Sequence, residues 1–327
     1  MERKKMACVV SVILLFAFIV SVPVARADYP EKPIEIIVHS APGGGSDLFA
    51  RSVAHIMEGE GIVKQKMQVV NRTGGGGTVA LNYLATKKDD PYCFMNVTTS
   101  PLSALIRGSS KLKFEDVVPI AMLMEDPNLA FTRYDSPFKD MKSVIAEAKK
   151  APKKINVAIG NIGGSEHISA HRTAKAAGVE FNIVSFKSGG EAAVALLGGH
   201  VDISFGNINE QMGQIEAKKV RPLAIMTEKR VPYLPDLPTM KEEGFQAVFS
   251  QIRGFWGPTG FPPEAVKFWE DSFTKFIKTK GFKDMLDTNQ AVEVFLKHEE
   301  FKVFLVKYIN ELSQDVKELE IYQEKKQ

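Results

Sequence analysis

The fold of this 327-residue chain is decided by the stretch Ile34-Glu35-Ile36-Ile37-Val38-His39-Ser40-Ala41-Pro42-Gly43-Gly44-Gly45-Ser46-Asp47-Leu48. Its β-branched start predicts a strand, the proline and glycines predict a turn, and Ser46 or Asp47 is placed to cap a helix from Leu48. Glycines allow close approach of the backbone to a ligand, and the first amides of a helix point outward at the positive end of its dipole. The stretch therefore predicts either a small anion site or a glycine-rich turn that binds nothing.

Strand and helix patterns alternate along the rest of the chain. Seven apolar runs have strand character: 34–38, 68–70, 94–97, 155–159, 181–185, 201–205 and 222–226. Helical patterns follow several of them, and the chain from Ala265 onward is mostly helical in pattern. This alternation is typical of βα units that build parallel sheets, and the length favours two domains over one. We therefore predict a two-domain α/β protein.

Four glycine-rich turns follow four of the predicted strands. They are Gly43–Gly45, Gly74–Gly77, Gly160-Asn161-Ile162-Gly163-Gly164-Ser165 and Lys187-Ser188-Gly189-Gly190. An α/β protein binds its ligand at the carboxyl ends of its strands, often between domains. Because the turns are shared between the two halves of the chain, they predict an anion held between the domains.

The chain begins like an exported protein. A basic segment, Glu2-Arg3-Lys4-Lys5, precedes an uncharged run from Ala7 to Val22, and Ala25-Arg26-Ala27 resembles a signal-peptidase site. An uncleaved membrane anchor is the alternative, because the apolar run approaches spanning length. Pro23 and the Ala-x-Ala ending favour cleavage, so we expect residues 1–27 to be a signal peptide and Asp28–Gln327 the mature protein.

The leader accounts for the net charge of the chain. The 327 residues include 42 basic and 39 acidic side chains, and the leader alone holds four basic residues and one acidic residue. The mature protein therefore has no net charge, which gives a nucleic-acid partner no support. Cys93 is the one cysteine after the leader, so no intrachain disulfide can form.

Catalytic and metal motifs are weak. The segment from Gly163 to His167 approaches a nucleophile elbow but ends in histidine, and Ser165 fits better as a helix N-cap. His167 and His171 share a helical face, yet no cysteine cluster or zincin motif accompanies them. We predict no enzymatic activity, metal or cofactor, with an exported α/β hydrolase that uses Ser165 and His167 as an alternative.

Several longer motifs resemble the Bug-type solute-binding proteins, the periplasmic receptors of tripartite tricarboxylate transporters. They follow the family order over nearly all of the mature chain. The motifs are Tyr29-Pro30-Glu31-Lys32-Pro33-Ile34, Ala41–Asp47, Val70-Asn71-Arg72-Thr73-Gly74-Gly75-Gly76-Gly77, Gly163–His167, Phe186–Gly190, Leu197-Gly198-Gly199-His200-Val201-Asp202, Leu234–Thr239 and Gly257-Pro258-Thr259-Gly260.

The resemblance implies a two-lobed type II periplasmic-binding fold, with each lobe a βα-built sheet flanked by helices and the ligand in the interlobe cleft. Lobe 1 would comprise residues 28–126 and 254–327, and lobe 2 residues 127–253. It implies a monomeric periplasmic receptor that captures a small organic carboxylate and delivers it to the membrane permease of a tripartite tricarboxylate transporter. A ligand sensor with the same fold is an alternative.

The resemblance also implies which residues line the site. Members of the family hold a ligand carboxylate with backbone amides from one loop in each lobe. The matching positions are Gly44, Gly45, Ser46 and Asp47 on the first loop, Gly164, Ser165 and His167 on the second, and Lys187, Gly189, Gly190 and Asp202 around the cleft.

Some of these positions need a separate interpretation. Asp47 and Asp202 cannot attract a carboxylate, so each either fixes the loops by accepting hydrogen bonds or simply caps a turn. Phe186 stands where the family commonly has tyrosine, and Asn207-Ile208-Asn209-Glu210 is this chain's own version of a variable loop. Both departures bear on which ligand is bound.

Overall fold

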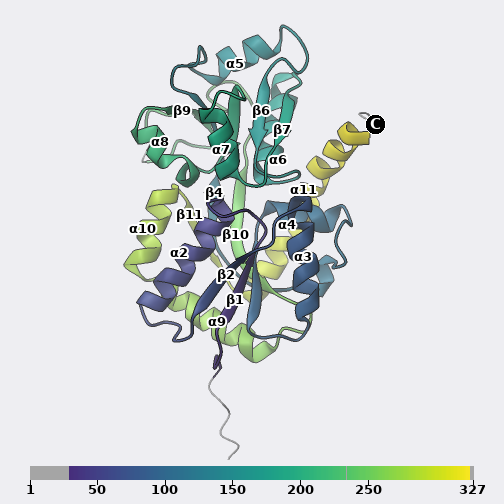
Figure 1. The fold of residues 1–327 in the computed structure, drawn as a ribbon, viewed down its shortest axis with the longest axis vertical. Helices are drawn as coiled ribbons and strands as arrows, with labels where there is room; N and C mark the ends of the chain where they lie inside the picture. Colours follow the sequence, from purple (N-terminus) through teal and green to yellow (C-terminus); the bar gives the residue numbers. More distant parts are fainter. Residues whose placement is uncertain (1–28, 233, 325–327) are drawn as a thin grey trace, which may run out of the picture. The chain divides into compact units, whose positions relative to one another are not determined.

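A computed structural model describes residues 29–232 and 234–324, so the predicted signal peptide lies outside the described residues. Two sheets, each flanked by helices, form the fold (Figure 1). The six-stranded sheet has the order β11-β4-β10-β3-β1-β2, and the five-stranded sheet has the order β7-β6-β8-β5-β9. The two-sheet α/β architecture predicted from the sequence is confirmed.

The strands of the six-stranded sheet are β1 (Ile34–Val38), β2 (Met67–Asn71), β3 (Cys93–Val97), β4 (Val118–Pro127), β10 (Ser250–Gly257) and β11 (Val292–Leu296). Those of the five-stranded sheet are β5 (Leu129–Arg133), β6 (Asn156–Ile159), β7 (Asn182–Ser185), β8 (Ile203–Gly206) and β9 (Val220–Ile225). All seven predicted apolar runs overlap strands, because their β-branched and other apolar residues fit the pleated surface of these sheets.

Both sheets are mixed, whereas the sequence predicted parallel sheets. The pairs β1–β2, β1–β3, β6–β7 and β6–β8 are parallel, as expected for βα units. Strand β10 is antiparallel to β3 and β4, and β5 is antiparallel to β8 and β9. The antiparallel strands lie where the chain passes between sheets, after β4 and before β10, so no crossover helix fixes a parallel direction.

The helices are α2 (Gly45–Gly59), α3 (Thr78–Leu84), α4 (Thr99–Ile106), α5 (Met141–Ala148), α6 (Ser165–Ala177), α7 (Gly189–Leu197), α8 (Met212–Glu216), α9 (Pro263–Phe276), α10 (Lys280–Asn289) and α11 (His298–Glu324). Short 3-10 turns in the described part of the chain are η1 (Gly75–Gly77), η2 (Ala85–Lys87), η3 (Phe114–Asp116) and η4 (Ile208–Glu210). Helices α5, α6, α7 and α8 accompany the five-stranded sheet, and α2, α3, α9 and α10 accompany the six-stranded sheet (Figure 1).

Helix α2 begins three residues earlier than predicted. Gly44 is its N-cap, in extended backbone with φ of −80°, and no side chain caps the helix. The prediction that Ser46 or Asp47 caps it is wrong, and so is the prediction for Ser165, because Gly164 is the N-cap of α6. A glycine cap leaves the first amides of each helix open to a neighbour, since no side-chain oxygen folds back over them.

An aromatic cluster fills the core behind β1 and β3. Phe255 of β10 stacks on Phe49 and Phe273, with ring centroids 5.4 Å apart in each pair. Phe94 meets Trp269 edge to face at 4.7 Å. Because each buried aromatic contributes about 1.5–3 kcal/mol, this cluster fixes β10 and the helices behind the site. Phe255 and Trp256 of β10 are therefore part of the core.

The C-terminal helix α11 contacts elements of both sheets. It packs on β4 and α4, and it also meets α6 of the five-stranded sheet. Asp315 pairs with Arg172 at 2.7 Å, and Glu318 pairs with Lys175 at 2.7 Å and with His171 at 2.8 Å. His171 is thus used in a helix–helix contact. Within residues 29–232 and 234–324, no helix is long and apolar enough to span a bilayer.

Candidate functional site

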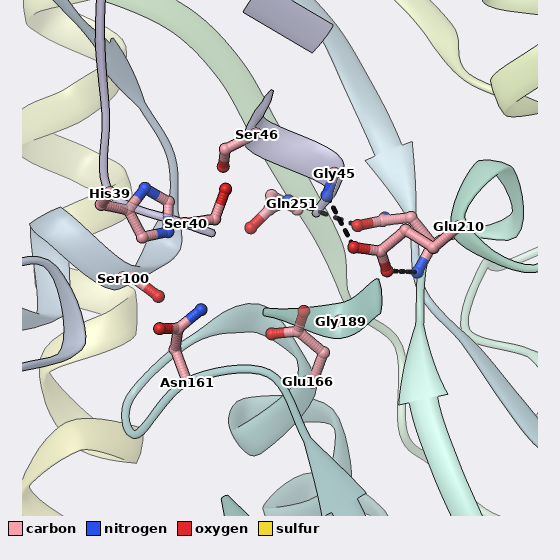
Figure 2. Close-up of a pocket in the computed structure, with 11 residues that line it drawn as sticks. His39, Ser40, Gly45, Ser46, Ser100, Asn161, Glu166, Gly189, Glu210 and Gln251 are labelled. Carbon is pink, nitrogen blue, oxygen red and sulfur yellow. Dashed lines mark hydrogen bonds between the residues drawn. The ribbon is translucent and has the colours of Figure 1, made fainter. Parts of the chain in front are cut away.

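Four helices begin at one polar cavity. The cavity is lined by His39, Ser40, Gly45, Ser46, Ser100, Asn161, Glu166, Gly189, Asn207, Glu210 and Gln251. Gly45 and Ser46 open α2, Ser100 lies in the first turn of α4, Glu166 in that of α6, and Gly189 opens α7. Figure 2 shows these residues facing one another across the cavity.

The sequence places these helix starts together through the parallel strands. Helices α2, α4, α6 and α7 each follow a strand whose carboxyl end points toward the cavity: β1, β3, β6 and β7. Their outward amides and dipoles make the positive ends of four helices converge. Such an arrangement attracts anionic groups.

Among the residues that the structure describes, none that lines the cavity has an aliphatic side chain, and His39 alone has an aromatic ring. Burial and the nearby Arg253 guanidinium lower the pKa of His39 to about 3, so this imidazole is neutral. His39 and Ser40 are each 3% exposed, and neither His39 Nδ1 nor Ser40 Oγ has a hydrogen-bond partner among the described residues. These atoms face the cavity ready to contact a polar ligand (Figure 2).

Two glutamate side chains, Glu166 and Glu210, line the cavity. The Gly45 amide donates to Glu210 Oε1 at 2.6 Å, and the Asn207 amide donates to Glu210 Oε2 at 3.2 Å. Burial and the neighbouring carboxylate of Glu166 raise the pKa of Glu210 to about 8. Burial also raises the pKa of Glu166, which accepts a hydrogen bond from the Ser165 hydroxyl at 3.3 Å.

An ion pair lies beside the cavity. Arg253 of β10 and Asp126 of β4 are both fully buried, and a guanidinium nitrogen lies 2.5 Å from the carboxylate. Arg253 also donates to Asn207 Oδ1 at 3.0 Å. Arg253 is therefore neutralised by its partner and positions Asn207, at the start of the loop that carries Glu210.

Three residues predicted for the site line the cavity: Gly45, Ser46 and Gly189. Five others lie within two residues of a lining residue along the chain: Gly44 is next to Gly45, Gly190 is next to Gly189, and the other three flank Glu166. They are Gly44, Gly164, Ser165, His167 and Gly190.

The remaining three predicted residues do not line the cavity. Asp47 accepts hydrogen bonds from the Gly43 amide, Arg51 and Asn71 at 2.9–3.0 Å, which fixes the first glycine turn. Burial raises the pKa of Asp47, but these partners outweigh it and hold the pKa below its usual range. Lys187 is exposed, and its carbonyl accepts from the Ala41 amide at 3.3 Å.

Asp202 lies at the opposite end of its strand from the cavity. It precedes β8, and its carboxylate accepts from the Asn156 backbone amide at 2.7 Å and from the Asn156 side chain at 3.1 Å. Asn156 is the first residue of β6, whereas the cavity lies beyond the last. The carboxylate therefore joins the amino ends of two strands.

The glycine turns of the two sheets touch each other directly. A Cβ atom on Gly44 would lie 2.8 Å from Ser188 Cβ, and one on Gly190 would lie 2.8 Å from the Gly43 carbonyl oxygen. A Cβ atom on Gly164 would likewise lie 2.8 Å from Ser100 Oγ. These glycines are needed for the close approach of the first glycine turn and α4 to the starts of α6 and α7.

Sequence reasoning did not assign eight lining residues to the site. They are His39, Ser40, Ser100, Asn161, Glu166, Asn207, Glu210 and Gln251. Two signals pointed toward some of them: Asn161 lies inside a glycine turn, and Glu210 ends the loop that departs from the family. Gln251 had no signal, because β10 was not predicted as a strand.

The geometry at Ser165 and His167 differs from a nucleophile and its base. The Ser165 hydroxyl donates to Glu166, and the Gly163 amide donates to His167 Nδ1 at 3.1 Å. Residues two apart on a helix do not face each other. Among the described residues, no group of three or more histidine, cysteine or acidic side chains is arranged to hold a metal ion.

Comparison with known proteins identifies the family of this chain. The family model described as "Tripartite tricarboxylate transporter family receptor" matches residues 49–320. This chain belongs to the tripartite tricarboxylate transporter receptor family. It is a solute-binding receptor and not an enzyme.

Individual relatives agree with the family assignment. Protein BugT of Bordetella pertussis is 25% identical over 323 residues, covering 97% of this chain and 98% of BugT. The structure of the periplasmic binding protein BugD is 26% identical with a TM-score of 0.82, covering 89% of this chain and 98% of BugD. MatC from Rhodopseudomonas palustris with bound malate shares the fold, at 22% identity and a TM-score of 0.80, over 89% of this chain and 99% of MatC.

Proposed function

We propose that this receptor binds a small polar organic acid in the cavity where α2, α4, α6 and α7 begin. The observation that carries the proposal is the convergence of four helix N-termini on a lining without aliphatic side chains. A ligand carboxylate there accepts charge-assisted hydrogen bonds worth about 1.5–3 kcal/mol each. Four or five such bonds total about 6–15 kcal/mol, a range that spans the roughly 8 kcal/mol of a micromolar site and at its upper end also covers the cost of closure.

We propose that the sequence-predicted residues on the glycine turns contribute to this site through their backbone. The amides of Ser46, the second residue of α2, and Ser165, the first residue of α6, would donate to the ligand, while Gly44 and Gly164 keep the helix starts free of a side-chain cap. The backbone amides of Gly189 and Gly190, the first two residues of α7, would also donate to the ligand. His167 supports the second loop through its bond with Gly163.

The proposed motion is closure of two lobes, residues 28–126 with 254–327 and residues 127–253. In support, β4 ends at Pro127 and belongs to one sheet, while β5 begins at Leu129 and belongs to the other. The chain returns between β9, which ends at Ile225, and β10, which begins at Ser250. A ligand that contacts both lobes favours the closed state, because its differential affinity shifts the equilibrium.

We further propose that the protein works in the periplasm as a monomer and presents its ligand to permease subunits of a tripartite tricarboxylate transporter. The leader-like residues 1–27 and the family support this location. Intact-mass measurement of protein from the periplasmic fraction should give a chain that begins at Asp28. A chain that retains residues 1–27 and sediments with membranes would contradict the proposal.

A thermal-shift screen of the exported protein against mono-, di- and tricarboxylates tests the ligand class. A ligand at a hundred times its dissociation constant should stabilise the fold by about 2.7 kcal/mol, which raises the midpoint by several degrees. Ser46→Pro removes one amide and the hydroxyl, and Ser46→Ala removes only the hydroxyl. Affinity should fall more for Ser46→Pro, and no shift with any acid would overturn the proposal.

A further inference from the structure

The glycine turn Gly74–Gly77 does not line the cavity, although it follows a strand as the other three glycine turns do. Each of its four glycines has a positive φ, between 57° and 126°. Residues with a Cβ atom rarely adopt such a backbone, so glycine is needed at this turn for its shape. Ligand binding in the cavity does not by itself account for that shape.

This turn contacts the glycine turn that follows β6 of the other sheet. A Cβ atom on Gly76 would collide with the carbonyl oxygen of Ile162, so the two backbones meet because Gly76 has no side chain. The glycine turns therefore meet in pairs across the two sheets. Gly43–Gly45 contacts the start of α7, and Gly74–Gly77 contacts the turn before α6.

The side chain of Arg107 lies between the turns of this second pair. Arg107 is the C-cap of α4 and is half-buried. A Cβ atom on Gly76 would lie 3.1 Å from one terminal nitrogen of its guanidinium, and a Cβ atom on Gly163 would collide with the other. The guanidinium thus packs on the backbone of both turns. Its planar shape suits so narrow a gap, which a lysine ammonium would not fill in the same way.

The turn that Arg107 contacts also carries a lining residue of the cavity. Asn161 lies two residues before Gly163 and faces the cavity beside Ser100 (Figure 2). The Gly164 amide donates to the Asn161 carbonyl oxygen at 3.1 Å, which braces the turn against the start of α6. Contact with Arg107 therefore fixes this lining residue and the start of α6 relative to the six-stranded sheet.

Resting on the proposed function, we infer that Arg107 is a positioning residue for ligand binding, although it does not line the cavity. Its guanidinium holds the turn that carries Asn161 against the six-stranded-sheet side, and so favours the arrangement in which both sheets contact the ligand. Because a ligand binds this closed arrangement, a smaller closed fraction weakens the observed affinity by the same factor. The effect depends on packing between two turns and not on which acid is bound.

Calorimetry with acetate, succinate, malate and citrate, which carry one to three carboxylates, measures the effect on binding. For the acid that the wild type binds most tightly, Arg107→Ala should raise the Kd at least about fivefold, the lower end of the usual range for coupling. Gly108→Ala is the matched control, since its φ is 64° and no atom of the described residues lies within 4 Å of the added Cβ. It should keep the wild-type Kd. An unchanged Kd in Arg107→Ala would overturn the inference and leave the proposed function intact.

A double-mutant cycle separates positioning from a general loss of stability. Gly163→Ala places a methyl group against the guanidinium, so it should weaken binding strongly in the wild type. In the Arg107→Ala background the same change should cost at least about fivefold less affinity, because the guanidinium is absent. The backbone strain from a φ of 71° is equal in both backgrounds and cancels. Additive effects on Kd would overturn the inference.

A disulfide across the other pair of turns measures closure without any acid. The Cβ atoms of Gly44→Cys and Ser188→Cys would lie 2.8 Å apart, so their sulfur atoms come within bonding reach as the turns approach. Burial raises the pKa of the native Cys93 to about 12, which keeps this thiol out of the exchange. With oxidised glutathione, adding Arg107→Ala should slow bond formation at least about fivefold, and adding Gly108→Ala should not.

The disulfide rates also keep the two proposals distinguishable. Equal rates with and without Arg107→Ala would overturn the inference, whatever the acids do. Absence of binding by all four acids would overturn the proposed function, and slower bond formation in Arg107→Ala would still support the role of Arg107 in closure.

Discussion

The backbone amide of Gly45 donates to Oε1 of Glu210 across 2.6 Å, although the two residues are 165 positions apart in the chain. A carboxylate of the protein itself therefore occupies the first amide of α2. The same side chain accepts from the Asn207 amide, so it is fixed at both oxygens. This contact joins α2, the first helix beside the six-stranded sheet, to the loop after β8.

Glu210→Gln should stabilise the ligand-free protein at pH 8 and have little effect at pH 4. The pKa of Glu210 is raised to about 8 in the folded protein and is about 4.3 in an unfolded chain. Between these values the unfolded state loses the proton first, so wild-type stability falls as the pH rises, by about 1.4 kcal/mol for each unit of pKa difference. Glutamine resembles the protonated acid and avoids this loss.

Thermal unfolding midpoints from pH 4 to pH 9 measure this effect. The difference between Glu210→Gln and wild type should grow with pH and level off above pH 8. Glu115→Gln serves as the control, since its carboxylate is exposed. A difference that is constant over the whole range would contradict a raised pKa at Glu210.

Gly190→Ala should weaken ligand binding without lowering fold stability. Its Cβ would lie 2.8 Å from the Gly43 carbonyl oxygen, so it pushes the start of α7 away from the first glycine turn. Overpacking of about 1–3 kcal/mol corresponds to about five- to 150-fold weaker binding. Alanine also favours helix over glycine by about 1 kcal/mol, which offsets local strain. Calorimetry and small-angle scattering measure affinity and closure.

Gly213→Ala in α8 is the matched control for this prediction. It makes the same change within a helix, and no atom lies within 4 Å of the added Cβ. It should keep the affinity and the scattering profile of the wild type. If Gly190→Ala behaves in the same way, the contact between the glycine turns has no part in closure.

Asp202→Ala should destabilise the fold and leave ligand affinity unchanged. Its carboxylate accepts two hydrogen bonds from Asn156 at the ends of β6 and β8 away from the cavity. Loss of these bonds costs about 1–3 kcal/mol. Urea unfolding measures the stability, and calorimetry on the folded fraction measures affinity. A loss of affinity beyond that explained by unfolding would instead place Asp202 among the ligand-binding residues, as the family resemblance implied.

Glu318→Gln should reduce the loss of unfolding free energy that the wild type shows as the pH falls below about 4.3. The Lys175 ammonium at 2.7 Å, assisted by His171, holds the pKa of Glu318 at about 2 against the effect of desolvation. Because this pKa is depressed, the stabilisation is present above about pH 4.3 and is lost as the pH falls toward 2. The side chain is 32% exposed, so solvent screening keeps the contribution below about 1 kcal/mol at neutral pH.

Chemical unfolding at pH 6 and at pH 2.5, in low and high salt, measures this contribution. The variant should differ from wild type at pH 6 in low salt, and the difference should shrink at pH 2.5 and in high salt. Glu311→Gln on the same helix is a control, since its lysine partner lies 3.9 Å away and both side chains are exposed. An equal effect of both variants would show that the α11–α6 contact adds nothing.

The sequence by itself determined the strands, turns and helix starts that are set by residues adjacent in the chain. The run Ile34–Val38 is a strand because its β-branched side chains fit a buried sheet, and glycines after it end the strand and begin α2. Because parallel strands end at the same edge, the glycine turns after β1, β6 and β7 were expected to converge, and residues Gly45, Ser46 and Gly189 do line one cavity.

Tertiary structure alone decided the charge of that cavity. Glu166 reads locally as a first-turn residue of α6, and Glu210 as the end of a short turn, with nothing in either segment that indicates a shared space. Gln251 lies on β10, whose neighbours β3 and β4 come from more than a hundred residues earlier. Burial, the Gly45 amide and the mutual repulsion of two carboxylates arise only when the sheets are assembled, because electrostatic energy depends on distance and solvation and not on sequence position.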